Sequence, residues 1–340
     1  MSSSKYFSLS VTCVLFVLLF SIGAVQFSGF GSVRVFANLF TDNAFLIITA
    51  IGMTFVIISG GIDLSVGAVI ALTGVACASM IDQFQWHPLA VFPLLLVGGT
   101  LFGVVMGALI HYYQLQPFIV TLAGMFLARG LATTISEQSI PIEHEFYDTV
   151  ADFGFALPGN GWLGSSTLIM LAIILLAIYI AHYTRLGGYI YALGGNRQSA
   201  QLMGVPMART TITIYAISGF LSSLGGIVFS FYTFSGYSLA GVGLELDAIA
   251  AVVIGGTLLT GGVGFVFGTL VGVLIMGTIQ TYISFDGTLN SWWTKIVIGI
   301  LLFLFIGMQR LLTQFNKTLP VLHWGEQKKP SVGQNREAEL

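Results

Sequence analysis

Residues that could do chemistry are few inside the apolar segments of this chain. Arg129 is the ionisable residue that lies well inside such a segment, and an ionisable group within a membrane span is a usual sign of a proton or ion relay. Asp63 lies in the glycine-rich break GGIDLSVG and Asp247 in ELDAIAA, each near the start of an apolar segment. Each carboxylate is placed to cap a helix N-terminus, or alternatively to serve as a gate; Asp63 could also contact a partner protein.

Polar and aromatic side chains gather near one end of the last two apolar segments. Tryptophan and tyrosine favour membrane interfaces, so an aromatic belt explains this group. The alternative is an outer mouth, where a polyhydroxylated ligand would meet stacking rings and hydrogen-bonding groups. The set comprises Gln280, Tyr282, Asp286, Asn290, Trp292 and Trp293.

The sequence predicts no catalytic site, metal site or bound cofactor. The five histidines (87, 111, 144, 182 and 323) have no ligand spacing. A phosphate-binding loop needs a Gly-Lys pair, and no lysine of this chain follows a glycine. No nucleophile elbow is present. If ATP drives this protein, a partner must bind the ATP and its magnesium.

Composition places the chain in a membrane. Of 340 residues, 56% are apolar and only 8% are charged, whereas a soluble domain carries roughly a quarter charged residues. The net charge of −2 implies no nucleic-acid partner. A spanning helix needs about 20 apolar residues. We therefore expect an all-α, multi-pass protein with one membrane domain over residues 1–315 and about ten spans, at 7–27, 43–60, 64–81, 89–111, 117–136, 165–182, 211–233, 247–260, 264–284 and 292–312.

The basic residues predict the orientation. With ten spans and a cytoplasmic N-terminus, nine of the 12 Lys and Arg residues fall on the cytoplasmic side, as the positive-inside rule requires. Both termini are then cytoplasmic, including a tail at 316–340. The segment 183–210 becomes a basic cytoplasmic loop, of a size to be a handle for another protein. The acidic segment 137–162 becomes a large periplasmic loop, either a solvated connector or a docking or gate-covering surface.

Small residues predict how the spans pack. Glycines at i and i+4 allow close helix approach in lipid. Gly99, Gly103 and Gly107 have this spacing, as do Gly268 and Gly272. These faces would pack either within the chain or against a second subunit. Segments 56–74 and 252–272 both read as apolar span, glycine-rich break and apolar span, a pattern that points to a transport path.

Three stretches carry a resemblance to a known family. GMTFVIISGGIDLSVGAVIALTG, GGYIYALGGNRQSAQLMGV and LELDAIAAVVIGGTLLTGGVGFVFGTLVG resemble the permeases of bacterial ABC importers for ribose, xylose and galactosides, over about residues 35–315. The chain as a whole is especially similar to galactofuranose importer permeases. This resemblance implies a bacterial inner-membrane location, an ATPase subunit, a periplasmic sugar-binding protein and a second permease subunit, which in galactofuranose-type systems is a different chain.

The resemblance also gives the basic loop a role. Importer permeases insert a short cytoplasmic helix, often marked E-A-A-x-x-x-G, into a cleft of the ATPase. Here the corresponding stretch is QSAQLMG, so Asn196 is the expected N-cap. The residues implied in ATPase coupling are Asn196, Arg197, Gln198, Ser199, Ala200 and Gly204. For Asp63 the implied contact is likewise the ATPase.

These observations predict import of a monosaccharide by alternating access, driven by the partner ATPase. An ion-coupled secondary sugar carrier is the main alternative, and it would need a titratable or ion-binding group at mid-depth, where only Arg129 is available. A membrane-embedded enzyme would need clustered carboxylates, histidines or lysines, which here are dispersed. A passive channel would conduct without any ATPase.

Overall fold

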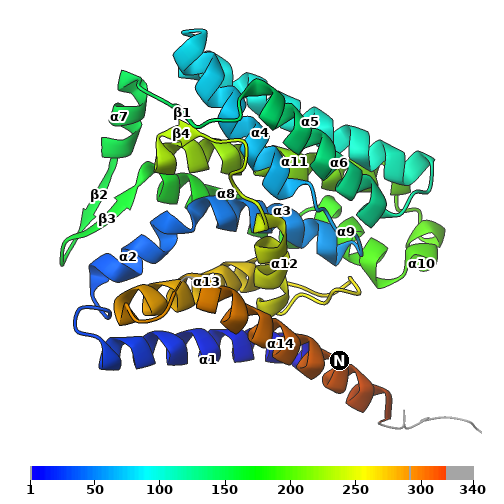
Figure 1. Cartoon of the computed structure of the whole chain (residues 1–340). Helices are drawn as coiled ribbons and strands as arrows, with labels where there is room; N and C mark the ends of the chain where they lie inside the picture. Colours follow the sequence, from blue (N-terminus) through cyan, green and yellow to red (C-terminus); the bar gives the residue numbers. More distant parts are fainter. Residues whose placement is uncertain (1, 291, 319–340) are drawn as a thin grey trace, which may run out of the picture.

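The structure is a computed structural model that describes residues 2–290 and 292–318. Its helices are α1 (Ser2–Gln26), α2 (Val33–Asp42), α3 (Ala44–Ile58), α4 (Val66–Ala78) continued by the π-helical turn η1 (Ser79–Gln83), α5 (Pro88–Tyr112), α6 (Pro117–Ile135), α7 (Glu145–Asp152), α8 (Ser165–Tyr183), α9 (Arg185–Gly195), α10 (Arg197–Leu202), α11 (Met207–Thr233), α12 (Leu244–Ile254), α13 (Val266–Asp286) and α14 (Trp292–Thr318). Four short strands accompany them: β1 (Ile140–Pro141), β2 (Gly154–Leu157), β3 (Gly161–Gly164) and β4 (Ser235–Gly236). Helices α9 and α10 lie at one end of the bundle, and α7 with the β2–β3 hairpin lies at the opposite end (Figure 1).

The all-α class is confirmed, but the count of ten full spans is not. Within the described residues, eight helices are long and apolar enough to cross a membrane, or nine if the bent pair α2 and α3 forms one span. All ten predicted segments contain a helix. However, residues 247–260 yield only α12, whose 11 residues rise about 16 Å, against about 30 Å for a bilayer core. Most of the predicted tail, from residue 319 on, lies outside the described residues.

Helix α3 forms the centre of the core. Every residue of α3 except Phe45 is buried. A helix that is apolar all round belongs in an interior, because it has no polar face to turn outward. Helices α8, α9, α11, α12 and α13 all contact α3. The core therefore surrounds one short, fully enclosed helix.

The predicted glycine faces pack inside the chain. A Cβ at Gly103 of α5 would collide with the backbone of Tyr215 in α11, and a Cβ at Gly107 would lie 2.8 Å from Ile212. Gly268 and Gly272 of α13 likewise press on the backbone of α12. Small-residue spacing thus brings these helix pairs together closely. It does not mark a contact with a second subunit.

The acidic loop 137–162 forms an ordered cap at one end of the bundle. Strand β1 pairs antiparallel with β4, and β2 pairs antiparallel with β3. Tyr147 of α7 is fully buried, and its Oη lies 3.2 Å from Cys77 Sγ of α4 and 3.0 Å from Ser230 Oγ of α11. Burial raises the pKa of Tyr147, so its hydroxyl stays protonated. This residue fastens α7 to the ends of two core helices.

Candidate functional site

The basic loop folds into two helices, α9 and α10, joined at Asn196. As predicted, Asn196 caps α10: its Oδ1 accepts a hydrogen bond from Ser199 N at 2.8 Å. This bond satisfies one of the backbone donors that the start of a helix leaves free. The cap turns the chain sharply between α9 and α10 and makes α10 project from the bundle end (Figure 1).

The surface of α10 is only partly the one expected from the sequence. Arg197, Gln198 and Ser199 are exposed, but Ala200 is fully buried and faces the chain itself. Two apolar side chains also protrude, Leu202 at 89% exposed and Met203 at 70%. The sequence reasoning missed both residues, although an apolar pair inside a polar basic loop was a signal for them.

Gly204 closes the loop after α10. It has φ +80°, and Val205 N donates to Ala200 O at 3.1 Å across the turn. This pattern ends a helix with one residue in the left-handed region, which glycine adopts without strain. A Cβ at Gly204 would meet nothing within 4 Å, so the requirement for glycine is conformational rather than steric.

Helix α9 ends against the two glycine-rich breaks of the bundle. Gly262 N, in the break after α12, donates to Ile58 O at the end of α3 at 2.8 Å. Gly194 of α9 is wedged beside both groups: a Cβ there would collide with Ile58 O and lie 2.6 Å from Gly262 N. We call the residues at 58–61, 194–195 and 261–262 the glycine junction. It joins α9 to the end of α3 and to the loop between α12 and α13.

One side-chain bond and several backbone conformations hold this arrangement. Tyr191 Oη of α9 donates to Gly264 O at 2.7 Å. Gly60, Gly261 and Gly262 all have φ between +75° and +86°. Because only glycine adopts this region routinely, these residue types allow the three backbones to meet.

Asp63 has a structural position beside this junction. Its carboxylate is fully buried and accepts bonds from Ser65 N (3.0 Å), Ser65 Oγ (2.6 Å) and Ser218 Oγ of α11 (2.7 Å). The bond from Ser65 N orders the turn just before α4, but the N-cap of α4 is Ser65, so Asp63 does not cap the helix itself as the capping interpretation predicted. Its burial leaves Asp63 no surface to present to an ATPase.

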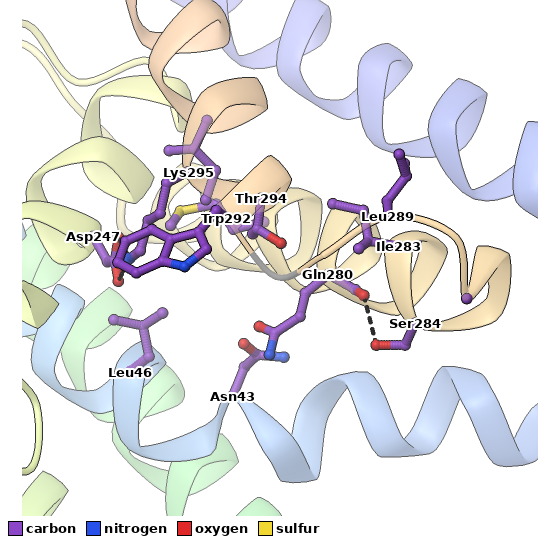
Figure 2. A pocket seen from close by; sticks show the side chains of 13 residues that line it. Asn43, Leu46, Asp247, Gln280, Ile283, Ser284, Leu289, Trp292, Thr294 and Lys295 are labelled. Atoms are coloured by element: carbon purple, nitrogen blue, oxygen red, sulfur yellow. Dashed lines mark hydrogen bonds and ion pairs between the residues drawn. The ribbon is translucent and has the colours of Figure 1, made fainter.

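A cavity of about 640 Å³ lies between the α2–α3 bend, α12, α13 and α14. This volume is in the range of small-molecule pockets. Figure 2 shows Asn43, Gln280, Trp292, Asp247 and Lys295 around it. Lys295 Nζ of α14 lies 2.6 Å from both carboxylate oxygens of Asp247, in the first turn of α12. The cavity thus offers amides, one indole ring and one ion pair.

Only part of the predicted outer mouth reaches this cavity. Gln280 and Trp292 line it, whereas Tyr282, Asp286 and Trp293 are not among its lining residues. Tyr282 Oη instead donates to Gln26 Oε1 at 2.6 Å.

Asp286 instead accepts hydrogen bonds from the backbone N and the side-chain hydroxyl of Thr288. Asn290 Oδ1 accepts from Trp292 N at 3.2 Å, which supports the start of α14. The sequence did not indicate Asn43 or Lys295 as lining residues.

An enclosed helical core, two broken spans and an exposed two-helix loop define a multi-pass membrane transport protein. Residues 35–306 match the model of the family described as "Branched-chain amino acid transport system / permease component", and the chain belongs to this family.

Several curated relatives cover most of the chain. It is 59% identical to the inner membrane ABC transporter permease protein YjfF of Escherichia coli K12, over 90% of this chain and 92% of that one. It is 38% identical to the fructose import permease protein FruG of Bifidobacterium longum, over 87% and 88%. It is 41% identical to the ribose import permease protein RbsC of Haemophilus influenzae, over 80% and 84%. The chain is therefore an inner-membrane permease of the ABC type rather than an enzyme.

Proposed function

We propose that this chain is a permease subunit of an ABC importer that moves a monosaccharide into the cytoplasm. The observation that carries the proposal is the glycine junction, which ties the exposed helix pair α9–α10 to the ends of both broken spans. The similarity to ribose and fructose import permeases supports sugar as the cargo class. Galactofuranose, or a related pentose or hexose, is the proposed sugar.

The loop can transmit the force that transport requires. Leu202 and Met203 present an apolar tip that suits a groove on a partner ATPase, because an apolar helix face gains most from burial in such a groove. One residue, Asn196, separates α10 from α9, and α9 ends in the junction. A displacement of α10 would therefore move the end of α3 and the loop between α12 and α13, which changes access from one side of the membrane to the other.

The cavity supplies a modest sugar site on the proposed path. Trp292 offers a ring for stacking against a sugar face, and Asn43 and Gln280 offer both hydrogen-bond donors and acceptors. The Asp247–Lys295 pair joins α12 to α14 across this cavity, and we propose that it opens and closes with the transport cycle. A weak site suffices because a periplasmic binding protein would select the sugar.

The remaining partners follow from this function. A separate ATPase would bind ATP and magnesium, and a second permease subunit would complete the membrane unit. The orientation proposed from the basic residues places α9–α10 in the cytoplasm and α7 in the periplasm. The ion-coupled alternative gains no support, because Arg129 Nη1 is held by the carbonyls of Ser238 and Ala240 at 2.7 Å each.

A pull-down from native membrane tests the proposal. The tagged chain is purified in mild detergent, and ATPase activity is measured in the eluate. We expect an ATP-hydrolysing subunit to co-purify, and the double variant Leu202→Ser/Met203→Ser to lose it. Tyr113→Ser, a control at an exposed aromatic residue between α5 and α6, should retain it. A chain that elutes without an ATPase yet transports in liposomes without ATP would overturn the proposal.

Uptake then identifies the cargo. Proteoliposomes that contain the complex, supplied with the binding protein and internal ATP, are offered labelled galactofuranose, ribose or fructose. A labelled branched-chain amino acid is offered as well, because the family is described as a permease of branched-chain amino acid transport. Uptake of the amino acid in place of every sugar would refute the sugar assignment.

A further inference from the structure

A non-helical segment runs deep into the bundle between β4 and α12. Residues 237–243 form turns rather than a helix. At its start, Gly236 packs against Gly74 of α4; near its end, Gly241 packs against Gly67, where a Cβ would lie 3.2 Å from the carbonyl. Gly74 and Gly67 are seven residues apart on a helix, so the segment descends roughly 10 Å along α4. Figure 1 shows α12, which follows, in the middle of the molecule.

Arg129 fixes the depth of this segment. It lies 12 residues after the start of α6 at Pro117 and six before the end at Ile135, which is about 18 Å and about 9 Å along the helix. Its Nη1 donates to Ser238 O and Ala240 O, at 2.7 Å each. The irregular backbone is therefore at the level of the hydrocarbon core and away from both bundle ends.

This deep segment is also at the surface of the chain. Val242 is 70% exposed, Leu246 is 62% exposed and Leu239 is exposed as well. Beneath them, Ser238 Oγ and Glu245 Oε2 are buried without a hydrogen-bond partner among the described residues. We call Arg129, residues 237–243 and Leu246 the mid-depth face. It combines apolar side chains with backbone and side-chain groups that need polar partners.

Exposure of the mid-depth face to lipid would be energetically unfavourable. Hydrocarbon cannot hydrogen-bond a non-helical backbone, so irregular segments at membrane depth occur where protein or a water-filled path covers them. A half-buried arginine adds to the cost of lipid exposure. By contrast, exposed Leu175 and Leu176 lie on the regular helix α8, whose backbone bonds are satisfied internally and which suits lipid.

We propose that the mid-depth face is where the second permease subunit packs. This rests on the proposed function, which supplies such a subunit. An ATPase or a periplasmic binding protein works in water at a bundle end and cannot reach this depth. Residues 319–340 of the chain itself are too polar to enter the membrane, with Lys328, Lys329, Arg336 and three glutamates. A second membrane-embedded chain is the occupant that fits.

Site-specific photocrosslinking tests the proposal on the intact complex in native membrane. The photoreactive residue p-benzoylphenylalanine replaces Val242 or Leu246, and Leu175 of α8 and Leu101 of α5 are matched exposed controls. After irradiation, adducts of the tagged chain are identified by mass spectrometry. We expect positions 242 and 246 to capture a permease chain, either a sister subunit or a second copy, and positions 175 and 101 to capture lipid.

Two outcomes would overturn the proposal. In the first, positions 242 and 246 give only lipid adducts although the ATPase still co-purifies. In the second, position 175 or 101 gives permease adducts as abundant as those at position 242. Loss of the ATPase from every sample, wild type included, would instead refute the proposed function. The ATPase measurement therefore distinguishes the two failures.

Discussion

Replacing Gly194 by alanine adds one methyl group at the point where α9 meets both breaks. The added Cβ would collide with Ile58 O and lie 2.6 Å from Gly262 N, whereas an ordinary contact begins near 3.4 Å. The backbones must therefore separate by nearly 1 Å or more. The neighbouring residue Gly195 provides the control, since a Cβ there meets nothing within 4 Å.

The size of the effect follows from two opposing contributions. Overpacking a well-packed site typically costs about 1–3 kcal/mol. Alanine in place of glycine in a helix returns roughly 0.5–1 kcal/mol. Gly194→Ala should therefore lower the free energy of unfolding by about 0–2 kcal/mol, and Gly195→Ala should raise it slightly. The difference between the two variants isolates the clash at about 1–3 kcal/mol.

Transport should respond more strongly than stability. We expect Gly194→Ala to insert, fold and bind the ATPase, yet to import much less sugar per ATP hydrolysed, because the added methyl group displaces α9 from the end of α3 and from the loop between α12 and α13. The assay is sugar uptake and ATP hydrolysis measured together in proteoliposomes, with thermal unfolding in detergent as the stability measurement. Equal coupling ratios and equal unfolding temperatures for both alanine variants would show that the junction transmits nothing.

Three further variants test other parts of the structure. Gly204→Val should abolish uptake but preserve membrane insertion, because a β-branched residue at φ +80° is strained by roughly 1–2 kcal/mol. Gly204→Asn should retain more activity than Gly204→Val. Equal uptake by both variants would contradict the conformational role of Gly204. Tyr147→Phe removes two buried hydrogen-bond contacts of α7 and should lower the free energy of unfolding by about 1 kcal/mol, measured by thermal unfolding. An unchanged unfolding temperature would show that the Tyr147 hydroxyl does not anchor α7. Lys295→Gln should lower the free energy of unfolding by only about 0.2–1 kcal/mol, because the ion pair with Asp247 is partly exposed. The same variant should change the KM for sugar uptake. An unchanged KM would show that the ion pair is not part of the sugar path.

Local signals in the sequence predicted local structure well. The Asn196 cap, the glycine-rich breaks and the segments that became long helices each depend on a few neighbouring residues. Helix geometry explains why the predicted outer mouth is divided. Gln280 and Tyr282 are two residues apart on α13, and residues with this spacing do not face the same side of a helix.

Contacts between distant segments were out of reach. The glycine junction joins residues near 58, 194 and 262. Local sequence patterns do not indicate which of the glycine-rich stretches meet in space. The burial of Ala200 has the same cause, because it depends on how α10 sits against the rest of the chain. Residues 247–260 resemble a full span in sequence because the apolar composition of α12 continues through the break that follows.

The enclosed position of α3 has a consequence for how the protein is made. Synthesis finishes α3 at residue 58, but α13, which helps to enclose it, ends at residue 286, which is 228 residues later. At roughly 5–20 residues per second, α3 waits on the order of 10–45 s before α13 is complete. Its two threonines are suited to this interval: Thr49 and Thr54 donate to the carbonyls of Phe45 and Ala50 at 2.8 and 2.7 Å, so their hydroxyls are satisfied within the helix before any tertiary contact forms.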